Sequence, residues 1–253
     1  MLLRIKAACG CHCGHLRKKN EDNFYFSGTY LAPDHGSMDR PICAGSWCAG
    51  GWTAAVFDGM GGEHHGQIAS FAAARALASV NLSALRRQFG LPECLTQLAR
   101  ELNRAVVAEQ QELQTSRMGS TMVGASFFRG TAYIWNLGDS RAYLLRAGQL
   151  RQLSVDHIAH MPPRPGRKPP LTQYLGIDPS EMMLEPAVCA ERCARGDLFL
   201  LCSDGLSDLL TRQEIAQILQ GCPDPEEHAA RLIEAALDRG GRDNITVIVC
   251  MIV

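Results

Sequence analysis

The fold class is decided by one stretch, Thr121-Met122-Val123-Gly124-Ala125-Ser126-Phe127-Phe128, with the turn Arg129-Gly130 and residues 131–137 that follow it. Its period-two pattern and the short turn predict two antiparallel strands. Residues 140–145 predict the next strand, which turns at Ala147-Gly148. Three strands joined by short turns form an antiparallel meander, so the sequence predicts an α+β protein and not a βαβ series.

Segments on either side of this stretch complete the expected order of elements. Before it, residues 4–13, 23–26 and 51–57 predict strands, and residues 67–89 and 92–115 predict two long helices packed as an antiparallel pair on a sheet. After it, we expect a strand at 198–202, helices at 212–220 and 225–239, and a closing strand at 244–253. Residues 27–50 are rich in Gly, Ser, Asp and Pro, which predicts a long loop.

Composition narrows the function classes before any motif is considered. The chain has 253 residues, 46% hydrophobic and 20% charged, which fits one ordered domain over 1–253. A net charge of −1 provides no basic field for nucleic acid. No apolar run reaches the roughly 20 residues of a membrane span, and the first residues lack the apolar segment of a signal peptide. We therefore expect a cytoplasmic protein without nucleic-acid or membrane partners.

Eleven cysteines are many for this length, and several gather near the first residues. Cys9, Cys11 and Cys13 lie beside His12 and His15, which leaves two interpretations. One is a zinc site, although no second Cys/His pair with finger-like spacing follows. The other is a strand whose cysteines fill one buried face as small apolar residues.

Four aspartates share one setting: each lies at an end of a predicted strand, beside Gly or Asn. They are Asp58, Asp139, Asp204 and Asp243, and the pair Glu21-Asp22 precedes the strand at 23–26. A single Asp-Gly is usually a turn, and Asp139 could cap a turn or pair with Arg141. Four such carboxylates with few cations nearby would repel one another unless divalent ions bind them. Oxygen ligands favour Mg²⁺ or Mn²⁺.

In combination these motifs resemble the PP2C-type (PPM) metal-dependent protein serine/threonine phosphatases in their bacterial form. The matching motifs occur in the family's order between Arg17 and Val249: Arg17-Lys18-Lys19-Asn20-Glu21-Asp22, Asp58-Gly59-Met60-Gly61-Gly62, Gly119-Ser120-Thr121, Gly138-Asp139-Ser140-Arg141, Ser203-Asp204-Gly205-Leu206 and Asp243-Asn244-Ile245-Thr246. The resemblance implies an αββα sandwich, in which two antiparallel sheets are flanked by helix pairs.

The resemblance also implies a role for each matching residue. Asp58 would bridge two metal ions, and the Gly59 carbonyl would bind one of them. Asp204 and Asp243 would hold the other. Three further roles follow: metal-bound waters oriented by Glu21 and Asp22, a third and weaker metal site at Asp139, and a grip on the substrate phosphate by Arg17.

The implied reaction is hydrolysis of phosphoserine and phosphothreonine by a hydroxide held between two Mn²⁺ or Mg²⁺ ions, without a phosphoenzyme. Ser203 is accordingly not expected to be a nucleophile. The implied partners are phosphorylated proteins and an opposing Ser/Thr kinase, and the chain is expected to be a monomer. Two alternatives stay open: a phosphatase for a small phosphoester, and a catalytically inactive binding module of the same fold.

Departures from the family pattern affect the leaving group and the flap. Met60 stands where some members carry a histidine acid, and His64 and His65 are weak substitutes for it. The flap at about 158–170 is short and Pro-rich and carries Arg164, Arg167 and Lys168. It is either a truncated linker or a stiff basic rim that favours acidic phosphoproteins.

Overall fold

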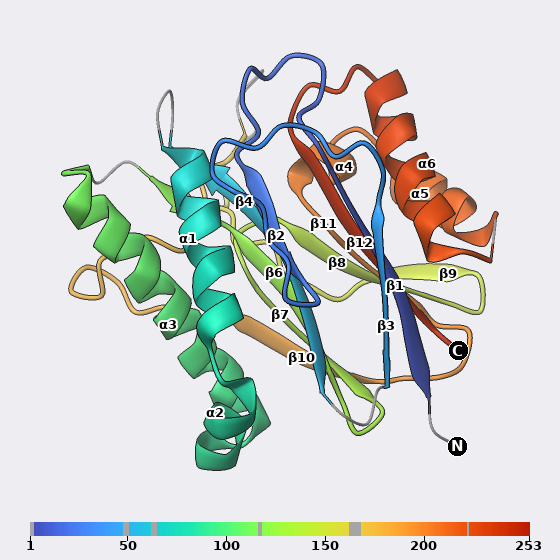
Figure 1. Ribbon diagram of the computed structural model, residues 1–253, viewed down its shortest axis with the longest axis horizontal. Coiled ribbons are helices and arrows are strands. Elements are labelled where there is room, and N and C mark those ends of the chain that lie inside the picture. The colour runs from blue at the N-terminus through green and yellow to red at the C-terminus, as the bar shows by residue number, and fades with distance from the viewer. Residues whose placement is uncertain (1–2, 48–50, 62–64, 116–117, 162–167, 222) are drawn as a thin grey trace.

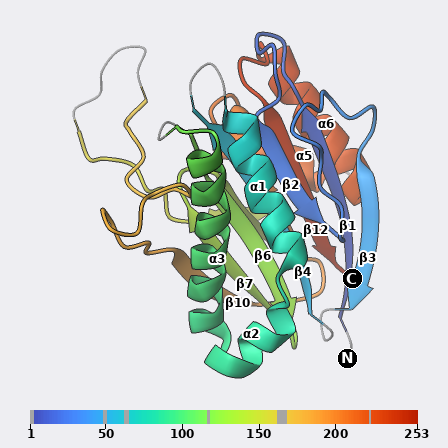
Figure 2. The same ribbon diagram turned by 60° about the vertical axis from the view of Figure 1, so that its left-hand side comes forward.

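The structure, a computed structural model, describes residues 3–47, 51–61, 65–115, 118–161, 168–221 and 223–253. Two antiparallel sheets pack face to face, and helices cover the outer face of each (Figures 1 and 2). The predicted α+β class and the four-layer αββα sandwich are confirmed.

The first sheet carries both ends of the described chain. Its order is β3 (Ile42–Trp47), β1 (Arg4–His12), β12 (Ile245–Ile252), β11 (Leu198–Cys202), β8 (Arg141–Arg146) and β9 (Gln149–Gln152). The second sheet has the order β10 (Ala187–Arg192), β7 (Thr131–Leu137), β6 (Met122–Phe128), β4 (Trp52–Met60) and β2 (Asp22–Phe26), with β5 (Gly119–Ser120) paired to the end of β4.

Three apolar layers hold the sandwich together. Between the sheets, Phe24, Phe127 and Phe199 are fully buried. On the second sheet lie α1 (Gly66–Ser79), α2 (Leu82–Phe89) and α3 (Leu91–Glu112), with α1 and α3 side by side in Figure 2. On the first sheet lie α5 (Arg212–Gln220) and α6 (Pro225–Asp238). Burial of these apolar faces is the main favourable term for folding.

The meander prediction is only partly right. The strands β6 and β7 form the expected hairpin, but β8 pairs with β11 and β9 in the other sheet. The chain changes sheets at Gly138, whose φ of +94° suits glycine, and Asp139 lies at this crossing. The alternating pattern of a strand does not say which sheet the strand joins.

Two other expectations are wrong in detail. The segment 27–50 contains an edge strand, β3, which pairs with β1 and alternates between half-buried and exposed residues. The single helix expected over 67–89 is two helices, broken at Val80 and Asn81. Asn81 is the N-cap of α2, and its side chain accepts a hydrogen bond from the Ala84 N–H at 2.9 Å.

No single helix among the described residues is long and apolar enough to cross a membrane. The bent pair of α1 and α2, which meet at 74°, passes the length and composition test only when both helices are counted together.

Candidate active site

Strand ends from both sheets bring the predicted acidic residues together near α4 (Asp204–Ser207), in the upper part of Figure 1. Asp58 in β4 is the register partner of Asp22 in β2. Asp204 follows β11 and Asp243 precedes β12 in the opposite sheet. A cavity of about 690 Å³, called here the acidic cavity, opens between them; its lining includes Arg17, Glu21, Asp58, Gly59, Asp204 and Asp243.

The motif Gly119-Ser120-Thr121 fixes the backbone of Asp58. The Thr121 N–H donates to the Asp58 carbonyl at 2.9 Å, and the Ser120 hydroxyl donates to the same oxygen at 3.2 Å. In return, the Asp58 N–H donates to the Thr121 hydroxyl at 3.2 Å. These bonds hold Asp58 rigidly on β4, which a bridging ligand requires.

Close backbone packing explains two of the motif glycines. A Cβ on Gly59 would lie 2.1 Å from the Gly66 carbonyl oxygen, and one on Gly205 would lie 1.9 Å from the Asn244 carbonyl oxygen. Neither position therefore admits a side chain without backbone movement. This packing places the chain at Asp58 against Gly66 at the start of α1, and the chain at Asp204 against Asn244.

Asn244 holds the loop that carries Arg17. Its side-chain oxygen accepts from the Glu21 N–H at 2.8 Å, and its amide donates to the carbonyls of Cys13 at 2.8 Å and Lys19 at 3.0 Å. The sequence showed Asn244 as part of a motif, but its role as the anchor of residues 13–21 is visible only in the structure.

Crowded carboxylates raise one another's pKa in the acidic cavity. Burial raises the pKa of Asp58 well above its usual range, and the charges of Asp204, Asp22, Asp139 and Asp243 raise it further. Burial also raises the pKa of Asp204. Such a group of acids holds protons, or needs bound cations, at neutral pH.

Of the cationic side chains that line this cavity, Arg17 and Lys168 pair with its aspartates. The Arg17 guanidinium pairs with Asp243, with 2.6 Å between Nη2 and Oδ2. Lys168, at the end of the flap, pairs with Asp204 and with Asp208. Asp208 had no signal in the sequence. Burial by itself lowers the pKa of Lys168, but these two carboxylates raise it overall. Lys168 therefore contacts the acidic cluster while about half of its side chain, 52%, stays exposed.

Asp22 ties the two sheets together beneath the cavity. Its Oδ2 accepts hydrogen bonds from the hydroxyls of Ser203 and Thr246, both at 2.7 Å. Burial raises the pKa of Asp22 to about 7, although these two hydrogen bonds lower it. Ser203 and Thr246 were recognised in motifs, yet their bonds to Asp22 had no signal in the sequence. The Ser203 hydroxyl is thus occupied as a donor.

Glu21 lies beside the start of α1. Its carbonyl accepts from the Gly59 N–H at 3.0 Å and from the Ser70 hydroxyl at 2.6 Å. Burial raises the pKa of its carboxyl group, while Arg17 and the Gly66 N–H lower it. The side chain therefore lines the acidic cavity next to Arg17.

Asp139 lies at the edge of the cluster, outside the lining of the acidic cavity. Burial and the charge of Asp204 raise its pKa to about 6, and Lys168 lowers it. The alternative of an Asp139–Arg141 pair is not realised, because Arg141 instead pairs with Asp156 at 2.6 Å. Asp139 thus faces the acidic residues from the crossing between the sheets.

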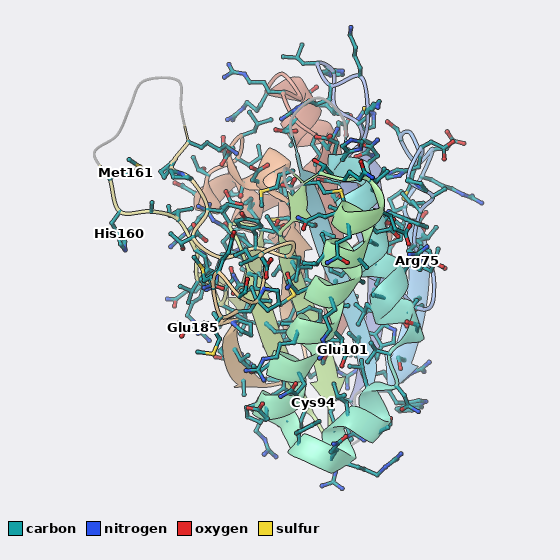
Figure 3. The ribbon with its side chains drawn as sticks, turned by 90° about the vertical axis from the view of Figure 1, so that its left-hand side faces the viewer. Arg75, Cys94, Glu101, His160, Met161 and Glu185 are labelled. Carbon is teal, nitrogen blue, oxygen red and sulfur yellow. The ribbon has the colours of Figure 1, made fainter. Side chains whose placement is uncertain are left out.

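The flap keeps a paired base. Ile158 and Leu171 form an isolated bridge, and the Ala159 N–H donates to the Pro170 carbonyl at 2.9 Å. His160 and Met161 project away from the body of the molecule (Figure 3). Arg164 and Arg167 lie outside the described residues, as does His64. Of the basic flap residues, Lys168 is the one that the described chain places at the cavity.

The cysteine cluster divides between core and loop. Cys9 and Cys11 are buried between the sheets. Cys13 follows β1 and is partly exposed, so the expectation that it shares their buried face is wrong. His12 and His15 contact each other edge to face at 6.4 Å. Cys13 thus lies apart from the two buried cysteines, and the zinc interpretation gains no support. Within the described ranges, no three Cys, His, Asp or Glu side chains are posed around a metal position, and this holds for the acidic cavity as well.

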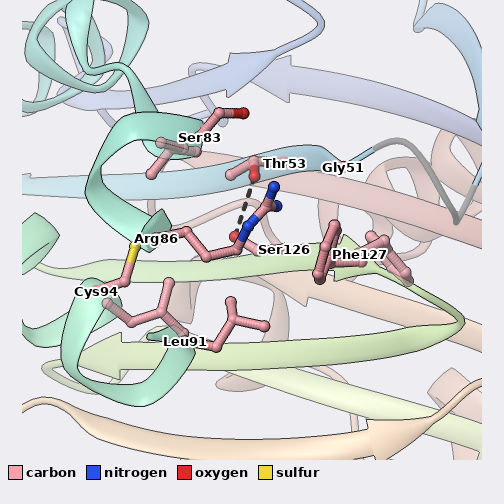
Figure 4. A pocket seen from close by; sticks show the side chains of 11 residues that line it. Gly51, Thr53, Ser83, Arg86, Leu91, Cys94, Ser126 and Phe127 are labelled. Atoms are coloured by element: carbon pink, nitrogen blue, oxygen red, sulfur yellow. Dashed lines mark hydrogen bonds between the residues drawn. The ribbon is translucent and has the colours of Figure 1, made fainter. Parts of the chain in front are cut away.

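A second cavity lies at the far end of the molecule between α2, α3, β4 and β6 (Figure 4). It has a volume of only about 70 Å³ and is bordered by Leu91, Leu95 and Phe127. Arg86 covers the neighbouring Phe128, with 3.6 Å between its Cζ and the ring centroid. This space is too small for a phosphorylated side chain with its backbone, and it has none of the aspartates.

The acidic cavity suits hard divalent cations by the chemistry of its donors, while its described carboxylates are arranged around Arg17 and Lys168 and not around a metal position. Its donors are carboxylate and carbonyl oxygens, which suit Mg²⁺ and Mn²⁺. The raised carboxylate pKa values and the pairing of Asp204 and Asp243 with cationic side chains show that the site attracts positive charge. Here the Lys168 ammonium group provides positive charge beside Asp204, and the Arg17 guanidinium group does so beside Asp243.

Comparison with known proteins gives the family. The model of the protein phosphatase 2C family matches residues 43–238. The serine/threonine protein phosphatase PstP of Mycobacterium tuberculosis is 34% identical over 233 residues, 88% of this chain. The serine/threonine phosphatase stp of Listeria monocytogenes is 32% identical over 250 residues, 93% of this chain and 91% of that protein.

Structural comparison agrees. The catalytic domain of PstP, solved in complex with two manganese ions, has a TM-score of 0.75 and 31% identity and matches 99% of each chain. The chain belongs to the protein phosphatase 2C family of metal-dependent phosphatases. It spans 45% of the full length of PstP.

Proposed function

We propose that this chain is a metal-dependent protein phosphatase that hydrolyses phosphoserine and phosphothreonine. The observation that carries the proposal is the meeting of Asp58, Asp204 and Asp243, from strand ends of both sheets, in one cavity that Arg17 also enters. All three aspartates are in place, which argues against a catalytically inactive binding module.

We assign the metal ligands by position. Asp58, whose backbone is hydrogen-bonded to Ser120 and Thr121, would bridge two ions, and the Gly59 carbonyl would bind one of them. Asp204 and Asp243 would hold the other, after release of Lys168 and Arg17. Glu21 and Asp22 would act through water, since Asp22 Oδ2 is already used by two hydroxyls. Asp139 would contribute to a third, weaker site.

When bound, Mn²⁺ or Mg²⁺ ions supply Lewis acidity, which lowers the pKa of water and offsets phosphate charge. The chain's own contribution is orientation. Arg17 can make two parallel hydrogen bonds to phosphate oxygens, and its guanidinium already reaches the cavity. Ser203 is fully buried and does not line the acidic cavity, which supports a reaction without a phosphoserine intermediate on the enzyme.

The proposal also covers the substrates, partners and location of the protein. The relatives named above support phosphorylated proteins as substrates. We further propose that the chain opposes a Ser/Thr kinase, acts as a monomer without nucleic-acid or membrane partners, folds as one domain over 1–253, and works in the cytoplasm.

A substrate panel tests the proposal. Phosphothreonine and phosphoserine peptides are compared with sugar phosphates and nucleotides at equal Mn²⁺ concentration, and kcat/KM is measured by phosphate release. The proposal predicts that the peptides are preferred. Efficient turnover of one small phosphoester with negligible peptide hydrolysis would instead identify a small-molecule phosphatase.

A further inference from the structure

Another cavity, distinct from the small space between α2 and α3, adjoins the acidic cavity and shares a wall with it. This cavity, called here the lysine cavity, has a volume of about 530 Å³. It lies between the loop that carries Lys18 and Lys19, the loop at residues 33–36, and the first turn of α1. Lys18 and Lys19 line both cavities.

The walls of the lysine cavity are fixed by hydrogen bonds. The Asn20 amide donates to the Gly36 carbonyl at 3.1 Å, and the Cys13 N–H donates to the Ser37 hydroxyl at 3.0 Å. The Ser70 hydroxyl of α1 donates to the Glu21 carbonyl at 2.6 Å. The cavity is therefore preformed, which lowers the entropy cost of binding a ligand there.

The charge of this cavity favours an anion. Lys18 and Lys19 are exposed, and neither ammonium group has an ion pair or a side-chain hydrogen bond with any described residue. Asp34 is the acidic residue of the lining, and burial lowers the pKa of His35. The lining of the lysine cavity thus has two lysines for one carboxylate. The charge of Lys19 also acts on Glu21 of the acidic cavity, whose pKa it lowers.

Apolar surface beside the lysines favours a peptide over a free ion. Pro33 and Ile68 line the same cavity as Lys18 and Lys19. An acidic side chain has an apolar stem that can pack on this surface while its carboxylate contacts the lysines, whereas a free ion would use the lysines alone.

The position relative to Arg17 gives the distance from the phosphate. Arg17, Lys18 and Lys19 are consecutive, and successive Cα atoms are about 3.8 Å apart. A substrate strand whose phosphate lies at Arg17 would therefore bring a residue about one to three places away level with the two lysines.

We propose that the lysine cavity binds an acidic residue that flanks the phosphorylated residue of the protein substrate, with Lys18 and Lys19 contacting its carboxylate. The inference rests on the proposed function and names the substrate class of the same site. It assigns Lys18 and Lys19 as specificity-determining residues and leaves the hydrolysis itself to the acidic cavity.

The test uses phosphothreonine peptides that differ only in flanking residues: glutamates on the N-terminal side, glutamates on the C-terminal side, or alanines on both. For the wild type, kcat/KM should be roughly three- to tenfold higher for one acidic peptide than for the alanine peptide, as expected for two exposed ion pairs. This preference should shrink as ionic strength rises.

Three variants locate the preference. The double variant Lys18→Ala/Lys19→Ala should bring the ratio of acidic to alanine peptide close to one. Asp34→Asn removes the competing carboxylate and should raise the ratio about twofold. Lys6→Ala removes an exposed lysine at the other end of β1 and should keep the wild-type ratio.

Three results would overturn the inference. The first is a wild-type ratio near one for both acidic peptides, and the second is a preference that survives in the double variant. An equal loss on an aryl phosphate and on all peptides in the double variant would also overturn it, because the lysines would then act on the phosphate itself. Failure of the proposed function looks different: the wild type would hydrolyse none of the peptides in Mn²⁺.

Discussion

Arg17 shows how far a single residue could be assigned from the chain alone. Its place four residues before Glu21 suggested a phosphate contact, and the structure directs its guanidinium into the acidic cavity. Its pairing with Asp243 at 2.6 Å was not foreseeable, because residues 226 positions apart meet only in the fold. The same holds for the bonds from Ser203 and Thr246 to Asp22.

Replacement of Arg17 tests the phosphate contact. Arg17→Ala should lower kcat/KM on a phosphopeptide about 10- to 100-fold, because a charge-assisted hydrogen bond contributes about 1.5–3 kcal/mol. Arg17→Lys keeps the charge without the fork and should lose less. Since the side chain is 48% exposed, the melting temperature should hardly change. Unchanged kcat/KM in Arg17→Ala would reduce it to a surface residue.

Asp139 allows a sharper test, because Arg141 pairs with Asp156 and the cap of a turn is the structural role left for Asp139. Asp139→Ala should leave tight Mn²⁺ binding, followed by calorimetry, intact while slowing turnover. The loss should be larger for phosphopeptides than for aryl phosphates, whose leaving group needs little protonation. Equal losses on both substrates with a lowered melting temperature would indicate that Asp139 merely caps the turn.

The raised pKa of Asp22 determines whether the free energy of unfolding rises or falls with pH. Its pKa is about 7 in the fold against 3.8 in a model compound. Between these values the folded protein holds a proton that the unfolded chain has released, so the free energy of unfolding falls as pH rises. Chelator-treated protein should melt at a lower temperature at pH 8 than at pH 5. Asp22→Asn, which mimics the protonated form, should show a smaller drop. A melting temperature that rises over this range would contradict the account.

At the scale of elements, the sequence predicted the hairpin turns, because the residues within a turn decide its geometry. The turns Arg129-Gly130 and Ala147-Gly148 have positive φ at both residues, 51° and 76° and then 49° and 79°, as a two-residue hairpin turn requires. The sheet that β8 joins was not predictable, because apolar residues alternate alike in either sheet. The edge strand β3 was missed because its centre, Ala44-Gly45-Ser46, consists of small residues with low strand preference.

The capping box of α5 provides a prediction for an element away from the site. The Thr211 hydroxyl accepts from the Glu214 N–H at 3.3 Å, and Glu214 accepts from the Thr211 N–H at 2.8 Å. Thr211→Ala should cost about 1 kcal/mol and lower the melting temperature by about 2–4 °C. Thr211→Ser keeps the hydroxyl and serves as the control. A changed kcat in Thr211→Ala would mean that α5 is coupled to the site.

For the whole molecule, the site is a property of the sandwich and not of one segment. Asp58 and Asp22 come from one sheet, and Asp204 and Asp243 from the other, so the cavity exists only when the two sheets pack together. The six motifs identified the family from the chain alone, because their order and chemistry are specific. The position of Lys168 could not be predicted, since the flap departs from the family pattern. Its partner Asp208, the C-cap of α4, lies outside the six motifs.

The central claim is that this junction of two sheets is a metal-dependent hydrolytic site. The most direct measurement is phosphate release from a phosphothreonine peptide as Mn²⁺ is added to chelator-treated protein, for the wild type and for Asp58→Asn. We predict no release before Mn²⁺ is added, recovery with Mn²⁺ in the wild type, and a loss of several orders of magnitude in Asp58→Asn, with its fold intact by circular dichroism. Release in excess chelator, or full Mn²⁺-dependent activity in Asp58→Asn, would contradict it.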